Sequence, residues 1–347
     1  MVEKNFFCQL KDGRDVYSYR ITNCHGEYAE LLDYGASIHA VVVRDKDGNL
    51  GDVVLGAGRD RLETCTYEGG TIGRCANRIA YGRYEANGKM IQLEQNCFGH
   101  FLHGAGGNYA HKLFHGEMRE EENKVIFYWH DSGEGGFDCG ADAAFSFSFD
   151  DEGNLALELT MTGEDTTVLN PTNHAYFNLS ETGDARDHTL WIAANRRTSR
   201  GEAGLPDGGG ISVENSPADF TKERTIREAM SSDPDGYFQK AVPSYDEFYL
   251  MDGRKWRHAA TLRCPANGRA MEVFTDMPCL VLFVSGDRRV EQGKDGRIYE
   301  GYCAVCLETG FVPNAVNCPE YDSPLFQKGE TLTAKTTYHF FTEDRFA

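Results

Sequence analysis

Several features that define other classes of protein are missing from this chain of 347 residues. It has no run of about eighteen apolar residues, the length that a membrane-spanning helix needs. Residues 1–11 lack the apolar core of a secretory signal peptide. The eleven cysteines are scattered and odd in number, which does not suit a disulfide framework and favours reduced thiols. We therefore expect a cytoplasmic protein with no membrane partner.

Basic residues are also scarce relative to acidic ones. The chain has 35 Lys and Arg against 54 Asp and Glu, which gives a formal net charge of -19. A field of this sign repels nucleic acid and anionic membranes, and it does not favour a polyphosphate ligand. A small neutral ligand fits it better. The chain is well supplied with hydrophobic residues, at 40%, and can bury a large core.

Helical periodicity is rare, and apolar and polar residues alternate instead with the period of two that is typical of strands. Strands are predicted at 125–129, 144–149, 155–162, 189–192, 271–275, 279–284, 299–308 and 331–340. Turn dipeptides such as Asn87-Gly88 separate them. A short helix is predicted at 222–230 and a single helical turn at 59–63.

The pattern keeps the same character on both sides of the glycine-rich segment 201–210, which we interpret as a surface loop and not as a linker. Residues 1–347 are therefore expected to form a single all-β domain. Many antiparallel strands joined by short turns, with few short helices, indicate a large antiparallel β sandwich.

Two titratable residues are candidates for proton transfer. His174 lies in Asn170-Pro-Thr-Asn-His-Ala-Tyr-Phe-Asn-Leu179, among amides, a hydroxyl and two aromatic rings. An imidazole on a rigid β scaffold beside such groups suits acid–base chemistry on a bound sugar. Glu308 ends the apolar strand predicted at 299–308, where a carboxylate is costly to bury, and is a candidate base. Alternatively, His174 only satisfies backbone groups and Glu308 is an exposed charge at a strand end.

Other polar residues are candidates for holding a ligand. Arg74 and Arg78 lie in the glycine-bounded segment 69–82, where each could donate to hydroxyls or form a structural salt bridge. His103 lies among glycines that would let a ligand approach closely. Asp246 precedes an aromatic run, a pattern that suits sugar hydroxyls and equally suits a turn leading into a strand.

No group of residues has convincing metal-ligand spacing. His111 and His115 are four apart but lack a partner glutamate or cysteine. Cys303 and Cys306 have the spacing of half a zinc site, yet residues three apart on a strand point to opposite faces. We therefore expect neither a metal nor an organic cofactor.

Taken together and in order, these segments resemble the aldose 1-epimerases, or galactose mutarotases. The landmarks are Gly73-Arg-Cys-Ala-Asn-Arg-Ile79, Leu102-His-Gly104, Thr172-Asn-His-Ala-Tyr-Phe-Asn-Leu179, Ser216-Pro-Ala-Asp-Phe220, Asp246 with its aromatics, Leu307-Glu-Thr309 and Pro313-Asn-Ala315. The resemblance implies a β supersandwich with an open sugar cleft.

The resemblance also implies roles for individual residues. Glu308 would remove the proton from the anomeric hydroxyl, and His174 would protonate the ring oxygen, the two facing each other across one pyranose. The residues that would hold a free aldose, such as galactose or glucose, are Asn77, Arg78, His103 and Asp246.

Two positions depart from the usual pattern of that family. Met277 precedes Pro278 where a glutamine is common, and Gly310 takes the place of another common glutamine. Losing an amide contact would weaken a hydroxyl interaction by about 0.5–1.5 kcal/mol, so the preferred sugar stays open. The alternatives are a non-catalytic carbohydrate-binding or sugar-sensing protein on the same fold and, ranked lowest for so acidic a chain, an epimerase acting on a phosphorylated hexose.

Overall fold

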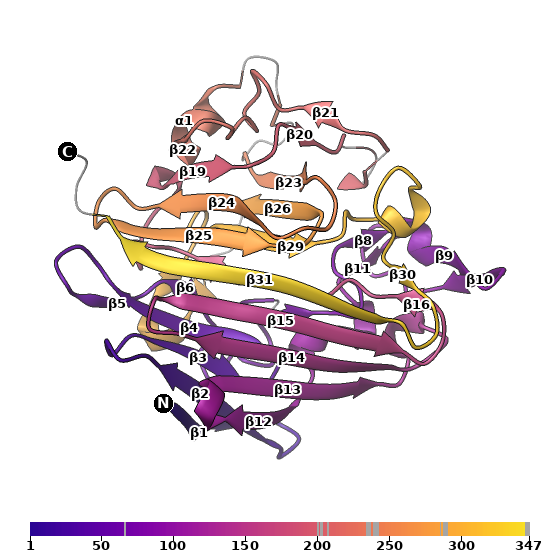
Figure 1. The fold of residues 1–347 in the computed structure, drawn as a ribbon, viewed down its shortest axis with the longest axis horizontal. Coiled ribbons are helices and arrows are strands. Elements are labelled where there is room, and N and C mark those ends of the chain that lie inside the picture. The colour runs from indigo at the N-terminus through magenta and orange to yellow at the C-terminus, as the bar shows by residue number, and fades with distance from the viewer. Residues whose placement is uncertain are drawn as a thin grey trace.

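The computed structural model describes residues 1–65, 67–199, 201, 204–206, 208–233, 237–238, 243–284, 286 and 291–343. Its largest element is a nine-stranded antiparallel sheet in the order β12-β13-β14-β15-β31-β25-β24-β19-β22, which faces the viewer in Figure 1. Its strands are β12 (His115–Arg119), β13 (Lys124–Asp131), β14 (Ala141–Phe149), β15 (Asn154–Gly163), β19 (Thr189–Ile192), β22 (Arg224–Thr225), β24 (Arg257–Arg263), β25 (Arg269–Thr275) and β31 (Thr331–Thr342).

Two five-stranded sheets accompany it, and β20 and β21 of the second one lie above it in Figure 1. One runs in chain order through β1 (Val2–Gln9), β2 (Asp15–Thr22), β3 (Tyr28–Leu32), β4 (Ser37–Arg44) and β5 (Leu50–Asp52). The other has the order β21 (Ile211–Ser212), β20 (Arg196–Arg197), β23 (Tyr245–Leu250), β26 (Cys279–Val284) and β29 (Cys306–Gly310). This arrangement confirms the expected antiparallel sandwich.

The remaining strands form separate two-stranded pairs. They are β6 (Val54–Leu55) with β18 (Tyr176–Phe177), β7 (Thr71–Ile72) with β17 (Thr172–Asn173), β8 (Arg78–Ile79) with β11 (Phe101–Leu102), β9 (Arg83–Ala86) with β10 (Lys89–Gln92), β16 (Thr167–Val168) with β30 (Leu325–Phe326), and β27 (Glu291–Gln292) with β28 (Ile298–Tyr299). Asn87 and Gly88 connect β9 to β10 with positive φ at both positions, as a tight hairpin turn requires.

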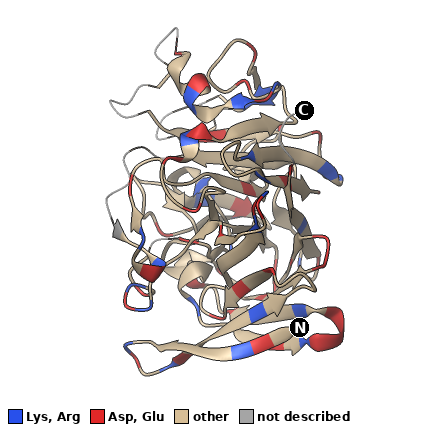
Figure 2. Ribbon diagram, turned by 90° about the vertical axis from the view of Figure 1, so that its left-hand side faces the viewer, with Lys and Arg blue, Asp and Glu red and all other residues tan. Residues whose placement is uncertain are grey.

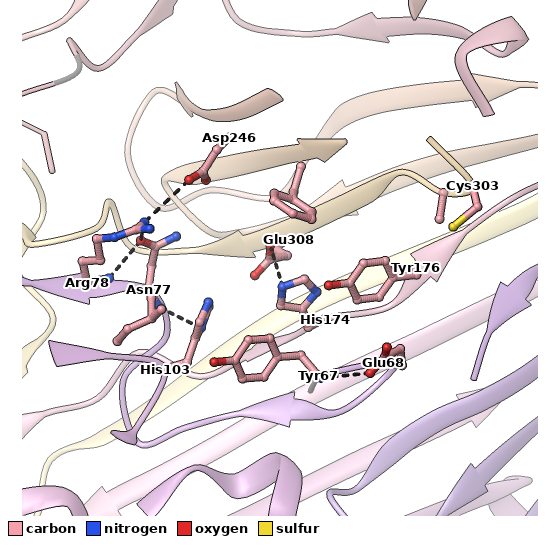
Figure 3. Close-up of a pocket in the computed structure, with 13 residues that line it drawn as sticks. Tyr67, Glu68, Asn77, Arg78, His103, His174, Tyr176, Asp246, Cys303 and Glu308 are labelled. Carbon is pink, nitrogen blue, oxygen red and sulfur yellow. Dashed lines mark hydrogen bonds and ion pairs between the residues drawn. The ribbon is translucent and has the colours of Figure 1, made fainter. Parts of the chain in front are cut away.

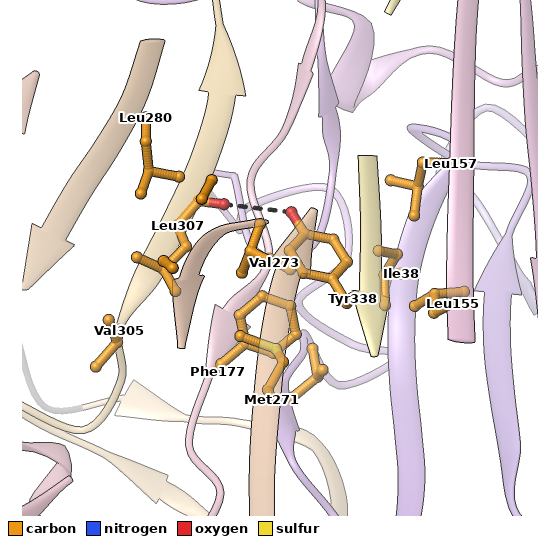
Figure 4. Packing of buried hydrophobic residues seen from close by; sticks show 14 of the residues in the cluster. Ile38, Leu155, Leu157, Phe177, Met271, Val273, Leu280, Val305, Leu307 and Tyr338 are labelled. Carbon is orange, nitrogen blue, oxygen red and sulfur yellow. Dashed lines mark hydrogen bonds between the residues drawn. The ribbon is translucent and has the colours of Figure 1, made fainter. Parts of the chain in front are cut away.

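The core lies between the sheets. Along β15 the side chains of Leu155, Leu157, Leu159 and Met161 are buried, while those between them are partly or fully exposed. This alternation is the reason the strand could be predicted. Figure 4 shows where the layers meet: the hydroxyl of Tyr338, on β31, donates to the backbone oxygen of Leu307 at 3.3 Å.

Helices contribute little to the described part of the chain. α1 (Ile226–Ser231) is shorter than the helix predicted at 222–230, because Thr225 caps it. The Thr225 hydroxyl accepts from the amide of Glu228, whose carboxylate accepts from the amide of Thr225. Residues 59–63 form hydrogen-bonded turns, and segment 201–210 lies partly outside the described residues.

One strand prediction was wrong. Residues 299–308 do not form a continuous strand: β28 ends at Tyr299, Tyr302 has a left-handed backbone with φ 62°, and β29 begins only at Cys306. Val305 exchanges two backbone hydrogen bonds with Phe177 before the chain joins β26. Tyr302 and Ala304 therefore do not share a strand face with Glu308, although Cys306 does.

Charged residues of both signs are spread over the molecule, as Figure 2 shows, and the acidic ones outnumber the basic ones. Within the described residues, no helix is long and apolar enough to cross a membrane. All eleven cysteines are present as thiols.

Candidate active site

A cleft of about 320 Å³ brings together all six residues predicted for the site. This volume is at the lower end of the roughly 300–1,000 Å³ typical of small-molecule sites. The lining residues are Tyr67, Glu68, Asn77, Arg78, Leu102, His103, His174, Tyr176, Asp246, Phe283, Cys303, Ala304 and Glu308. Figure 3 shows most of them pointing into one space.

Glu308 is positioned by the five-stranded sheet that contains β29. Its register pairs Glu308 with Val281, and Asp246 with Phe283, so that these side chains share one face. The neighbouring positions of the same strands, such as Leu307, point into the core. The period of two therefore places the carboxylates of Glu308 and Asp246 on the cleft side of this sheet.

His174 lies between β17 and β18, where regular pairing stops. Its backbone amide donates to the oxygen of Gly70 at 2.9 Å, and its carbonyl accepts from the amide of Gly69 at 3.0 Å. The imidazole is only 6% exposed. The alternative in which His174 merely satisfies backbone groups does not describe its side chain, which lines the cleft.

His174 and Glu308 are in direct contact. Nε2 of His174 lies 3.5 Å from Oε1 of Glu308, whose side chain is 5% exposed (Figure 3). The expectation that they face each other across a whole pyranose was therefore wrong. They lie side by side, because the β29 strand and the segment that follows β17 meet at this wall. Glu308 is likewise not the exposed strand-end charge of the alternative interpretation.

Burial controls the protonation of Glu308. Loss of hydration, with a smaller contribution from the negative charge of Asp246, raises the pKa of Glu308 to about 8. The carboxyl of Glu308 therefore holds a proton at neutral pH. A pKa so near neutrality suits a group that both accepts and returns a proton.

Arg78 and Asp246 form one end of the cleft. Their side chains approach to 3.6 Å, and Arg78 also donates to Oδ1 of Asn77, from its backbone amide at 2.9 Å and from its guanidinium at 3.4 Å. Both charged side chains remain partly exposed, at 17% and 28%. A fixed cation, a carboxylate and an amide at one place can serve the donors and acceptors of neighbouring hydroxyls.

His103 is held by two hydrogen bonds with Asn77, next to the β8–β11 pair. The backbone amide of Asn77 donates to Nδ1 of His103 at 3.2 Å, and the amide of His103 donates to the oxygen of Asn77 at 3.1 Å. Burial, with smaller electrostatic contributions from His174 and Arg78, lowers the pKa of His103 well below its usual range. His103 is therefore neutral, with its proton on Nε2, and is a hydrogen-bond donor.

The two arginines of segment 69–82 have different environments. Arg74 is fully buried: Nε lies 2.9 Å from Asp131, the NH1 group donates to Thr167 at 3.3 Å, and the guanidinium lies over the ring of Phe137. Arg74 therefore forms the structural salt bridge, whereas Arg78 lines the cleft.

The positions that depart from the family pattern do not line the cleft. Met277 is fully buried in the main core. Gly310 packs against Asn170, whose Oδ1 would lie 2.9 Å from an added Cβ. Asn170 in turn accepts from the amide of Phe311 at 2.8 Å. Neither position could therefore supply a glutamine amide to the cleft: Met277 is in the core, and Gly310 lies close to the side chain of Asn170.

Sequence reasoning found only one residue of the aromatic wall around His174, Tyr176. Tyr67, Tyr176 and Phe283 all contact His174, although they come from three separate segments. Tyr176 lies in the same motif as His174, which was the available signal; nothing in the sequence placed the other two there. As for metals, no cluster of three or more His, Cys, Asp or Glu residues able to hold an ion occurs among the described residues.

A β supersandwich whose cleft holds an adjoining imidazole and carboxylate, bordered by an arginine, an asparagine, an aspartate and a second histidine, has the groups needed for acid–base chemistry on a small polar molecule. The sequence matches the aldose 1-epimerase family over residues 17–339, and the chain belongs to that family.

Individual relatives agree with this assignment. The chain is 27% identical to aldose 1-epimerase from Escherichia coli (strain K12), with 96% of this chain and 97% of the relative covered. It is 30% identical to galactose mutarotase from Rattus norvegicus, with 90% of each covered.

Solved structures share the fold. An aldose epimerase homologue from C. elegans superposes with a TM-score of 0.86 at 23% identity, covering 94% of this chain and 98% of that one. Galactose 1-epimerase from Lactobacillus acidophilus gives a TM-score of 0.83 at 24% identity, covering 99% of each.

Proposed function

We propose that Glu308 and His174 are the acid–base pair with which this member of the aldose 1-epimerase family interconverts the α and β anomers of a free aldose. The observation that carries the proposal is their contact at 3.5 Å within the cleft. The anomeric hydroxyl and the ring oxygen are bonded to the same carbon. A base and an acid that lie side by side can therefore reach both oxygens at once.

The pair needs one proton in total. In the reactive form Glu308 is ionised and His174 is protonated. Glu308 takes the proton from the anomeric hydroxyl while His174 gives its proton to the ring oxygen. The bond between C1 and the ring oxygen breaks, and C1 becomes an aldehyde carbon.

Reclosure reverses these steps. Rotation about the C1–C2 bond presents the other face of the aldehyde to the C5 hydroxyl. His174 takes the proton of that hydroxyl as its oxygen attacks C1, and Glu308 returns a proton to the former carbonyl oxygen. The pair ends in its starting state, with the sugar as the other anomer.

The other predicted residues hold the sugar. Arg78, Asp246 and Asn77 bind ring hydroxyls at one end of the cleft, and His103 donates a hydrogen bond from Nε2. The substrate is a neutral aldose such as galactose or glucose, in keeping with the net charge of -19. The chain acts as one domain over residues 1–347, in the cytoplasm, where its thiols stay reduced.

Polarimetry of freshly dissolved α-anomers tests the activity. We expect the protein to accelerate mutarotation of galactose, glucose or both beyond the buffer rate. Failure with every aldose in a panel of hexoses and pentoses, combined with saturable sugar binding by calorimetry, would support the non-catalytic alternative instead.

Substitutions test the roles. Glu308→Gln and His174→Asn should each lower kcat by about 10²–10⁴-fold, the contribution typical of a general acid or base. Matched surface substitutions, Glu121→Gln and His115→Asn, should leave the rate unchanged, because both side chains are exposed outside the cleft. A folded Glu308→Gln or His174→Asn protein with the wild-type rate would contradict the assignment.

A further inference from the structure

The imidazole of His174 is enclosed by three aromatic rings, here called the aromatic box: Tyr67, Tyr176 and Phe283. The Tyr176 ring lies nearly parallel to it, at 4.9 Å and 13°, and the Tyr67 ring at 5.6 Å and 18° (Figure 3). Phe283 stands across it at 6.2 Å and 77°. Ring faces carry negative potential, so parallel tyrosines attract a cationic ring more strongly than a neutral one.

A buried imidazole that acts as an acid needs groups that stabilise its protonated form. The side chain of His174 is 6% exposed, and burial penalises the charged form of an imidazole. Nearby His103 shows the penalty acting: its pKa is well below the usual range, mainly because of burial. His103 contacts Tyr67 only at a tilt of 50°. The two histidines therefore differ in their described ring contacts: two tyrosine rings lie nearly parallel to His174, and none lies parallel to His103.

The stack is part of the scaffold. Tyr176 follows His174 by two residues and begins β18, whereas Tyr67 comes from the segment just before β7. Two backbone hydrogen bonds, between His174 and Gly69 and between His174 and Gly70, tie the Tyr67 segment to the histidine. Burial also raises the pKa of Tyr67, which keeps its ring neutral while the enzyme works.

We propose that Tyr176 and Tyr67 are positioning residues that hold the His174 ring and stabilise its protonated form, so that it can act as the acid in ring opening. This inference rests on the proposed function, since it gives the stack a purpose only if His174 donates the proton. Tyr176 has the larger effect, because its ring is closer to the imidazole and more nearly parallel to it.

The test is the acid limb of the pH profile of kcat/KM. On this limb activity falls because the His174–Glu308 pair takes up a second proton. That proton binds His174 when Glu308 is already protonated, so the position of the limb reports the pKa of His174 in that state. Removing a ring makes that protonation harder, so Tyr176→Leu should move the limb by roughly 0.5–1 pH unit to lower pH. Tyr67→Leu should move it less. Tyr176→Phe keeps the aromatic face and should restore the limb to its wild-type position.

Tyr81→Leu is the matched control, because Tyr81 is exposed and contacts a different histidine, His100, at 5.0 Å. It should not move the limb. Should Tyr176→Leu be inactive, the NMR titration of the His174 ring proton gives the same shift without turnover. A limb or titration that stays in place in Tyr176→Leu, or shifts equally in Tyr176→Phe, would overturn the inference. Wild-type protein that accelerates no aldose would overturn the proposed function as well.

Discussion

The nine-stranded sheet and the cleft are built in opposite ways. In the sheet, β14 and β15 pair in continuous register from Ala141–Gly163 to Phe149–Leu155. Around the cleft, the pairs β6–β18, β7–β17 and β8–β11 match only two residues of each strand. Long ladders give a rigid frame whose register is fixed by the alternation of buried side chains. Short ladders turn the backbone often, and this lets several segments deliver side chains to one point.

Two neighbouring arginines show what the difference means. Arg74 points into the frame and satisfies a buried carboxylate, whereas Arg78, four residues later, points into the cleft. The same residue type should therefore affect stability at one position and catalysis at the other.

Breaking the frame should have the largest effect. Arg74→Met leaves Asp131 buried without its cationic partner and should lower the free energy of unfolding by about 3–5 kcal/mol. Denaturant unfolding measures this loss. Arg119→Met removes a surface pair with Glu117 and should change stability little. A loss for Arg74→Met no larger than that of the control would show that the frame does not depend on this pair.

Ionisation of the buried Glu308 in the cleft should lower the free energy of unfolding, whereas the Arg74 pair in the frame should raise it. Because the pKa of Glu308 is raised to about 8 in the folded protein, its contribution to stability is present below its unfolded pKa and is lost as pH rises toward 8. Glu308→Gln cannot ionise and should be more stable than wild type at pH 8 by a few kcal/mol, on the order that linkage predicts.

Thermal unfolding at two pH values checks this expectation. The advantage of Glu308→Gln should largely disappear at about pH 5, where the wild-type carboxyl is mostly protonated in the folded state. An equal difference at both pH values would show that ionisation is not its cause.

Arg78 should matter for the sugar and not for the frame. Arg78→Met removes charged donors at the end of the cleft where we propose that sugar hydroxyls bind. It should lower kcat/KM by about 10–100-fold, since hydrogen bonds to charged groups contribute about 1.5–3 kcal/mol. Arg254→Met is the control, because Arg254 is also a partly exposed arginine paired with an aspartate, Asp276, at 3.3 Å, but it lies outside the cleft. Equal kinetic losses in the two variants would contradict the proposed binding role.

The dependence of kcat/KM on alkaline pH should be the smallest of these effects. Above the Glu308 pKa of about 8, the pair loses its last proton and His174 has none to give. Activity should therefore fall about tenfold per pH unit on the alkaline side. Polarimetry corrected for the buffer rate measures the profile, and activity that keeps rising through pH 9 would contradict the shared-proton scheme.

Much of the frame could be predicted because buried and exposed residues alternate along its strands. The runs at 125–129, 144–149 and 155–162 all lie within long paired strands, β13, β14 and β15. The prediction failed at 299–308 for a tertiary reason: Val305 pairs with Phe177, and the chain then changes partner to β26. Alternation within a segment carries no information about a change of partner.

The site could be predicted only through its resemblance to a family, since each residue taken alone had an equally good structural interpretation. The sequence by itself determined the residue types and the alternation that buries one face of each strand. Only the tertiary structure decided that Arg74 lies in the frame, that two tyrosines lie parallel to His174, and that Glu308 holds its proton to about pH 8. Contacts between distant segments and the loss of water around a charge exist only after the chain has folded.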